Sequence, residues 1–345
     1  MLAGLQQISS AGNQWQWNNL KGKALFFRSC AFFNLAQQFA APYDSATAAN
    51  DLGIPLRLSG NIDENPRRSS VQQTYNQIIN DLKQAVPLMD RLNQSNTNQP
   101  SREAAFAMLA RVYLSLNMYT QAGMYADSCL QLHSTLLNYY SLPISLSAPF
   151  PTLNNEIIFK AELPEKSDAL RALSTNSCIV DSTLYSSYEA NDLRQKILFM
   201  IMRGDSLPHP KKGYTRSVIP FCGLATDEMF LIRAECRARA GNFADAMNDL
   251  NTLLEHRYKA GSFIHLTAIN KDQALRYIIT ERRKELPFRG LRWTDLRRLN
   301  KEGLATTLTR RLKDTTFQLP PNDRLYVLPI PNEIILFSGI EQNQR

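Results

Sequence analysis

The chain has 345 residues, of which 44% are hydrophobic and 20% charged, a composition typical of a folded protein and not of a disordered one. The formal net charge of +8 would allow a nucleic acid or an anionic surface as partner. The one concentration of basic residues, between Arg282 and Lys301, is interleaved with Glu281, Glu285 and Asp295. Such mixing is typical of a salt-bridged helical surface, so we expect no nucleic acid as partner.

The five cysteines are odd in number and form no CxxC pair, which argues against a disulfide framework or a zinc site. No apolar run reaches the roughly 20 residues that a membrane-spanning helix needs. At the start, Leu2, Leu5 and Ile8 recur at a helical spacing, without the basic region and long apolar run of a signal peptide. This pattern predicts the last turns of a helix, with Met1 an internal residue of a longer protein.

Two helices are predicted in the N-terminal part of the chain. Apolar residues recur in steps of three and four from Leu20 to Ala41, which marks one helical face, and Pro42 ends the helix. A second helix is predicted from Val71 to Val86, where Pro87 follows.

A helical hairpin follows and is repeated 124 residues later. Ser101 is placed to cap a helix that runs to about Leu116, and a second helix runs from Tyr119 to about His133. A small residue, a turn residue, an aromatic residue and another small residue share one register in both copies: Ala110, Asn117, Tyr119 and Ala122 match Ala234, Gly241, Phe243 and Ala246. Two unrelated amphipathic hairpins could agree by coincidence, but four matching positions favour a tetratricopeptide-like unit.

The second copy is expected at Thr226–Ala240 and Phe243–Arg257, and a last helical pair at Lys271–Glu285 and Trp293–Asn300. The predicted fold is therefore mainly α, a scaffold of four tetratricopeptide-like helical hairpins that buries a continuous core. Residues 134–223 hold seven of the 17 prolines and five of the 13 tyrosines, which predicts a loop-rich insertion with a few short strands, such as Ile157–Phe159. Long loops on a rigid scaffold are where binding sites usually lie.

Signatures of catalysis are missing from the sequence. It contains no GxSxG, HExxH, P-loop or dinucleotide-binding glycine pattern. The four histidines are scattered, without a partner at a ligand-like spacing. A glycosidase would need two opposed carboxylates, and no pair of acidic residues is singled out. We therefore expect no enzyme, no cofactor and no metal.

An ordered set of short motifs resembles the SusD/RagB family and spans almost the whole chain. The motifs are Gly22–Arg28, Asn34–Gln37, Asp51–Arg57, Tyr75–Ala85, Ala104–Leu114, Asn155–Phe159, Asn191–Arg194, Lys212–Tyr214, Gly223–Glu228, Leu231–Glu235, Glu281–Leu286, Gly290–Arg297, Leu328–Ile334 and Gln342–Asn343.

This resemblance implies a non-catalytic, lipid-anchored protein on the outer-membrane surface of a Gram-negative bacterium. It would bind a glycan or related nutrient and deliver it to a SusC-like TonB-dependent transporter, with no cofactor. It implies an N-terminal helical part over 1–133 and a C-terminal part over 134–345, with a ligand region at 134–223 and hairpins at 226–300. Family members begin with a lipoprotein signal peptide and roughly a hundred further residues, so we expect this chain to be truncated and its lipid anchor to be missing.

Candidate ligand-binding residues are aromatic side chains on expected loops, because a sugar stacks its apolar face on a ring while polar groups hold its hydroxyls. They are Trp15, Trp17, Tyr43, Asp44, Tyr139, Tyr140, Tyr185, Tyr188 and Tyr214. Trp15 and Trp17 could instead pack against preceding helices, and Tyr185 and Tyr188 could belong to a short structural helix.

Two other functions remain open at this point. A tetratricopeptide-like scaffold could bind a protein or peptide in an open concave groove. A surface glycosidase would show a carboxylate pair in a cleft. The charge-rich stretch Glu281–Arg297 is expected to be structural, with Glu281 and Glu285 one helical turn apart and paired to Arg282, Arg289 and Arg292, so that it fixes the last hairpin to the scaffold.

Overall fold

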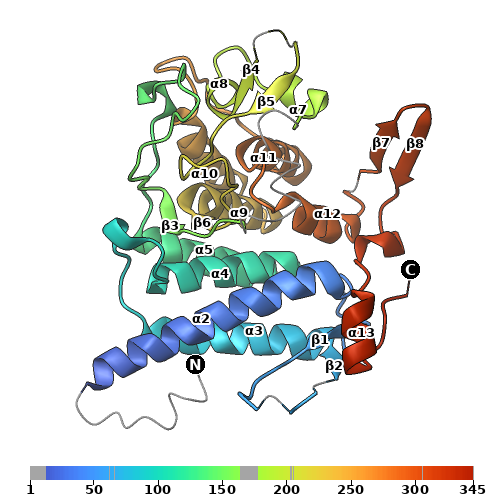
Figure 1. Cartoon of the computed structure of the whole chain (residues 1–345). Helices are drawn as coiled ribbons and strands as arrows, with labels where there is room; N and C mark the ends of the chain where they lie inside the picture. Colours follow the sequence, from blue (N-terminus) through green and yellow to red (C-terminus); the bar gives the residue numbers. More distant parts are fainter. Residues whose placement is uncertain are drawn as a thin grey trace. The chain divides into compact units, whose positions relative to one another are not determined.

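The computed structural model describes residues 13–61, 63–65, 67–163, 178–202, 204, 206–304 and 306–344. Over these residues the protein is mainly α-helical, with small two-stranded antiparallel sheets (Figure 1), which confirms the predicted fold class. No helix in this part of the chain is long and apolar enough to cross a membrane. The helical stripe predicted at Met1 to Ile8 lies outside the described residues.

The chain forms two compact units. Unit 1 comprises residues 1–90, 112–118 and 293–345, and unit 2 comprises residues 91–111 and 119–292. Neither unit is a continuous stretch of chain. One boundary, between residues 111 and 112, falls inside a helix. The division at residue 133 that the family resemblance implies stays a prediction, because these units are defined by how the chain packs.

Unit 1 is built on two helices, α2 (Gln14–Phe39) and α3 (Val71–Ala85), which pack against each other. Ser70 and Gln73 form a capping box at the start of α3. The short strands β1 (Leu52–Pro55) and β2 (Arg68–Ser70) pair beside these helices. Helix α3 lies close to its predicted range, whereas α2 ends near the predicted residue but begins at Gln14 and not at Leu20.

The start of α2 corrects one expectation. Trp15 and Trp17 lie within the helix and not on a loop before it. The helix begins early because the Asn13 side chain accepts a hydrogen bond from the Gln16 backbone N–H, and no proline interrupts α2. The Trp15 side chain is 60% exposed, whereas Trp17 is half-buried under the Lys21 ammonium.

The C-terminal part of unit 1 contains elements that the sequence did not predict. After α12 (Arg292–Asn300) come a hairpin of β7 (Leu308–Leu312) and β8 (Thr315–Leu319), a single 3-10 turn η4 (Arg324–Tyr326) and the short helix α13 (Asn332–Ser338). The hairpin is largely exposed on both strands. Pairing without burial leaves no hydrophobic alternation for a sequence pattern to detect.

Unit 2 contains the two repeated hairpins, apart from residues 112–118 of the first, which belong to unit 1. They are α4 (Arg102–Ser115) with α5 (Tyr119–Leu132), and α9 (Thr226–Arg239) with α10 (Phe243–Glu255), followed by α11 (Lys271–Glu285). The four paired alanines of the repeat are completely buried: Ala110, Ala122, Ala234 and Ala246. Both turns place one residue at positive φ, Asn117 at 58° and Gly241 at 86°. These observations support the repeat.

Helix α9 is the central helix of unit 2, packed against α5, α10 and α11. Eleven of its 14 residues are buried. On α5, a Cβ at Gly123 would approach Cys236 of α9 to 2.9 Å, so only glycine allows the two helices to come this close. Small residues therefore set the spacing of the hairpins, as the repeat pattern predicted.

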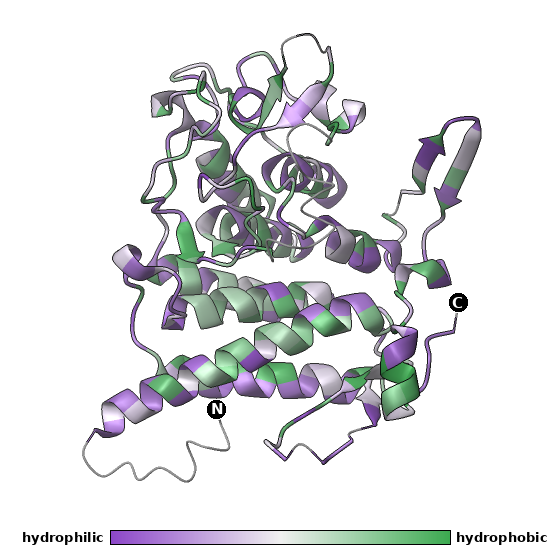
Figure 2. Ribbon diagram, viewed as in Figure 1, coloured by the Kyte–Doolittle hydropathy of each residue, from purple (hydrophilic) through white to green (hydrophobic). Residues whose placement is uncertain are grey.

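The predicted insertion is the least regular part of unit 2. Its short elements are η3 (Tyr139–Ser141), β3 (Ile157–Phe159), α7 (Ser182–Ser186), α8 (Arg194–Leu198), β4 (Phe199–Ile201) and β5 (Pro208–Pro210). Strand β3 is hydrophobic throughout (Figure 2) and pairs with β6 (Leu224–Ala225) at the start of α9. This pairing joins the insertion to the helical scaffold.

Candidate ligand-binding pocket

A buried network of ion pairs supports the loops of the insertion. Arg257 donates to Glu156 and Glu285 at 2.8 and 2.7 Å, and all three side chains are fully buried. Arg194 binds Asp192, Glu281 and Glu285 in the same way. The network therefore fastens residues 156 and 192–194 of the insertion to the end of α11.

A second branch of the network involves Tyr214. Its hydroxyl contacts Glu156 at 2.6 Å and Asp227 at 2.8 Å, and Arg289 pairs with Asp227 at 3.0 Å. Burial raises the pKa of Glu156. Burial also acts to raise the pKa of Asp227, but the neighbouring arginines 289 and 257 hold it below its ordinary value. Of the two carboxyl groups that contact Tyr214, Asp227 is thus kept as an anion.

The partners of the charge-rich stretch differ from those expected. Glu281 and Glu285 do share a helical face, but their arginines are Arg194 and Arg257, which come from distant parts of the chain. Arg282 and Arg289 pair with the α9 carboxylates Glu228 and Asp227. Helical spacing identifies neighbours on one element only, so it could not find these long-range partners. The expected role, fixing the last hairpin to the scaffold, fits these contacts.

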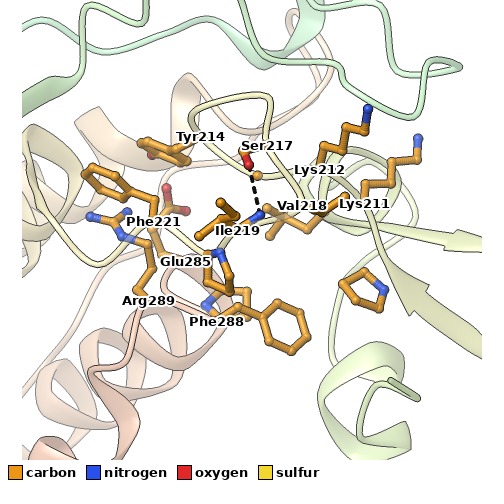
Figure 3. A pocket seen from close by; sticks show the side chains of 15 residues that line it. Lys211, Lys212, Tyr214, Ser217, Val218, Ile219, Phe221, Glu285, Phe288 and Arg289 are labelled. Carbon is orange, nitrogen blue, oxygen red and sulfur yellow. Dashed lines mark hydrogen bonds between the residues drawn. The ribbon is translucent and has the colours of Figure 1, made fainter. Parts of the chain in front are cut away.

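The network forms the floor of a pocket in unit 2. The pocket encloses about 650 Å³, open solvent at its mouth included. Residues 210–214 and 217–221 of the insertion line it, together with Leu198, Glu285 and residues 287–289. Figure 3 shows Tyr214, Phe221 and Arg289 grouped on one side, with Ile219 between them and Phe288. Lys211 and Lys212 extend away from the aromatic group.

Two aromatic rings lie against Arg289 in the pocket wall. Its guanidinium lies 4.7 Å from the centre of the Tyr214 ring and 4.5 Å from that of Phe221. The two rings are stacked on each other. The pocket loop is tightened further by the Ile219 backbone N–H, which donates to the Ser217 hydroxyl (Figure 3).

Phe288 is the aromatic side chain best placed for a ligand. It is half-buried, its backbone has a φ of 61°, and its ring meets Phe199 edge-on at 6.3 Å. A large side chain rarely adopts this left-handed conformation, and such strain is concentrated at functional sites. Sequence reasoning missed Phe288 because it lies within the Glu281–Arg297 stretch, which was interpreted as purely structural. The corner from Pro287 to Gly290 was the available signal.

The structure brings three of the predicted residues to this pocket or its rim. Tyr214 lines the pocket, and Tyr185 and Tyr188 pack on Phe199, which contacts Phe288. Tyr214 and Tyr188 are buried, and the Tyr188 hydroxyl donates to the Lys284 carbonyl. They support the pocket from behind, whereas Tyr185 is half-buried.

The other predicted residues lie elsewhere. Tyr139 is buried in the core of the insertion, and Tyr140 beside it is 51% exposed. In unit 1, Tyr43 is half-buried with its hydroxyl on Gln72, and Asp44 pairs with Lys301. Ligand contact at the buried tyrosines would require the core to rearrange, and the assignment of all nine residues stays a prediction.

The helical scaffold and the pocket together define the class of protein. A stack of helical hairpins supports an irregular region that contains the pocket, and the pocket wall has no carboxylate pair among its described residues. This is the architecture of a helical-repeat binding protein.

Two family models match the chain. Residues 1–114 match a SusD-like family described as starch-binding and associating with the outer membrane, and residues 207–344 match the SusD family. Between them the models cover well over half of the sequence, in the order that the motifs predict. The chain belongs to the SusD/RagB family. No curated protein matches it.

Solved structures show the same fold. A SusD superfamily protein from Bacteroides thetaiotaomicron is 22% identical, with a TM-score of 0.79, over 100% of this chain and 82% of that one. A protein from Bacteroides vulgatus described as a putative sugar binding protein is 24% identical, with a TM-score of 0.76, over 99% and 81%. A SusD-like carbohydrate binding protein from the same species is 22% identical, with a TM-score of 0.74, over 95% and 78%. Likeness at these identities establishes the fold.

Proposed function

We propose that this protein binds a glycan on the outer surface of the outer membrane and delivers it to a TonB-dependent transporter. Three points support the proposal: the family description as starch-binding and associated with the outer membrane, the sugar-binding descriptions of two structural relatives, and the pocket beside Phe288. The pocket is the observation that carries the proposal, because it offers an aromatic ring and an apolar Ile219 wall to the C–H face of a sugar.

The single carboxylate in the pocket lining favours binding over hydrolysis. Among its described lining residues, Glu285 is the single carboxylate. One oxygen of Glu285 accepts from Arg257 and the other from Arg194. Both oxygens of Glu285 are therefore engaged by arginines, and hydrolysis of a glycoside needs a second carboxylate across the bond. We therefore assign the pocket to ligand retention.

Gel electrophoresis in the presence of soluble polysaccharides tests the binding proposal. A panel of starch, other neutral glycans and acidic glycans should include at least one that retards the wild-type chain. Phe288→Ala should lose most of that retardation, because a stacking aromatic contributes on the order of 1 kcal/mol or more. Phe317→Ala is the matched control, since Phe317 is an exposed phenylalanine on β8. Equal retardation of Phe288→Ala and wild type would refute the pocket assignment.

Delivery to a transporter needs a separate test. A tagged form preceded by a lipoprotein signal peptide and expressed with a SusC-like TonB-dependent transporter should co-purify with that transporter from outer-membrane fractions. The same form should be accessible to protease added to intact cells. Recovery from the cytoplasm or periplasm alone, without the transporter, would contradict the proposal.

A further inference from the structure

The charges around the Phe288 pocket do not balance. Its described lining residues include the cations Lys211, Lys212 and Arg289 and the carboxylate Glu285. The buried network already neutralises Glu285 and Arg289. The two lysines have no carboxylate partner in the part of the chain that the structure describes. The pocket therefore presents two uncompensated positive charges to a ligand.

Lys211 is held in place without being neutralised. Its ammonium donates to the backbone carbonyls of Ile144 at 2.6 Å and Lys196 at 2.7 Å. An ammonium has three donors, so one of them is left for a ligand. Burial lowers the pKa of this ammonium, because removal from water disfavours its charged form. An anionic group on a ligand would supply the missing countercharge.

Lys212 follows directly and is open to a ligand. The residue is half-buried, and its ammonium is engaged by no hydrogen bond or ion pair within the described ranges. Figure 3 shows Lys211 and Lys212 extending in the same direction, away from the aromatic group. A sugar ring stacked on Phe288 would therefore meet the lysines with a substituent or a neighbouring unit, and not with the face that stacks.

The sequence around the two lysines is also basic. Residues 196–220 contain five basic residues and one acidic residue, Asp205, which gives a net charge of +4. That is half of the net charge of +8 that the whole chain carries. The stretch from Arg282 to Lys301 is interleaved with acidic residues, whereas this one is almost free of them. A cleft lined by charge of one sign raises the local concentration of ligands with the opposite charge.

We propose that the pocket takes an anionic glycan, one that carries carboxylate or sulfate groups. This ligand class rests on the proposed function, because it concerns the same pocket. A sugar ring stacks on Phe288, while an acidic group pairs with Lys212 and with the remaining donor of Lys211. A neutral polymer such as starch, which the family description names, would leave both lysines without a countercharge.

Gel electrophoresis with matched polysaccharides tests this proposal. Polygalacturonate is compared with its methyl ester, and dextran sulfate with dextran, so that each pair keeps its backbone and differs in charge. At least one anionic polymer should retard the wild-type chain more than its neutral counterpart does. The first pair detects recognition of a carboxylate, and the second detects recognition of a sulfate.

Two variants separate binding in the pocket from the general attraction of a basic protein to a polyanion. Lys212→Gln should weaken the retardation by that anionic polymer about twofold to fivefold. Lys259→Gln is the matched control, because it removes the same charge at an exposed lysine that does not line the pocket, and it should behave as wild type. Equal weakening in the two variants would overturn the proposal.

The remaining outcomes distinguish this proposal from the glycan function on which it rests. If a neutral polysaccharide retards the folded wild-type chain at least as strongly as the anionic polymers do, the anionic class is wrong and the glycan function stands. If no polysaccharide of either charge retards it, both are wrong.

Discussion

Arg257 in unit 2 and Arg297 in unit 1 are both buried arginines, but their surroundings are opposite. Arg257 is held by Glu156 and Glu285, and although burial acts to lower its pKa, these carboxylates raise it well above its ordinary value. Arg297 is held by backbone carbonyls, and burial lowers its pKa. The charge of one arginine is balanced by carboxylates, whereas the other has only carbonyl partners among the described residues.

The difference extends to the regions around them. The network of unit 2 matches six cations to six carboxylates: Arg111, Arg194, Arg257, Arg282, Lys284 and Arg289 with Glu156, Asp192, Asp227, Glu228, Glu281 and Glu285. Dense charge in the sequence therefore marks structure here, since each charge has an opposite partner.

Breaking the network should give the largest effect. Arg257→Met leaves Glu156 and Glu285 buried without their shared cation, and should lower the free energy of unfolding by about 3–5 kcal/mol. Urea unfolding measures this. Arg283→Met removes an exposed ion pair with Asp181 and should cost less than about 1 kcal/mol. Equal losses would show that the network does not hold the insertion in place.

Arg297→Met should have a smaller effect than Arg257→Met. It removes hydrogen bonds to the end of α2 but leaves no carboxylate unpaired, so a loss of about 1–3 kcal/mol is expected. The same urea titration compares the two variants. If Arg297→Met lowered the free energy of unfolding as much as Arg257→Met, the contrast between the two regions would be wrong.

Placing a larger side chain at a close helix contact of the repeat should lower the free energy of unfolding by a similar or smaller amount. Ala234→Leu adds volume at a completely buried position of α9 and should destabilise by about 1–3 kcal/mol. Ala244→Leu on α10 is the matched control, because Ala244 is exposed, and it should change stability by less than about 0.5 kcal/mol. Thermal melts of both variants test whether small residues set the helix spacing.

The smallest expected effect is the pH dependence of the stability that Asp192 contributes. Burial acts to raise the pKa of Asp192, but Arg194 and Lys284 hold it below its ordinary 3.8. A lowered folded-state pKa contributes stability that is present above about pH 4 and lost as the pH falls through the lower folded value. The stability gap between wild type and Asp192→Asn should therefore narrow between about pH 5 and pH 2. A constant gap would show that Asp192 is not stabilised as an anion.

The helices and the repeat could be predicted because their signals are local. Apolar spacing, Ser101 as a cap and the turn residues Asn117 and Gly241 act within a few residues of chain. The exposed β7–β8 hairpin and the ion-pair partners could not be predicted in this way. Arg194 meets Glu281 across 87 positions, and no periodicity connects them.

The pocket was predicted in its region but not in its residues. The insertion contains most of its wall, as expected, and Tyr214 lines it. Sequence reasoning took exposed tyrosines and tryptophans as the signal, whereas burial of Tyr139, Tyr188 and Tyr214 depends on long-range packing. Phe288 became a candidate only through its backbone conformation, which the sequence does not show directly.

A crystal structure of the chain with an oligosaccharide cut from the retained polysaccharide tests the central claim most directly. The account predicts a sugar ring against Phe288 and Ile219, with the arginine network beneath it unchanged. A ligand bound elsewhere, with the Phe288 pocket empty, would contradict it.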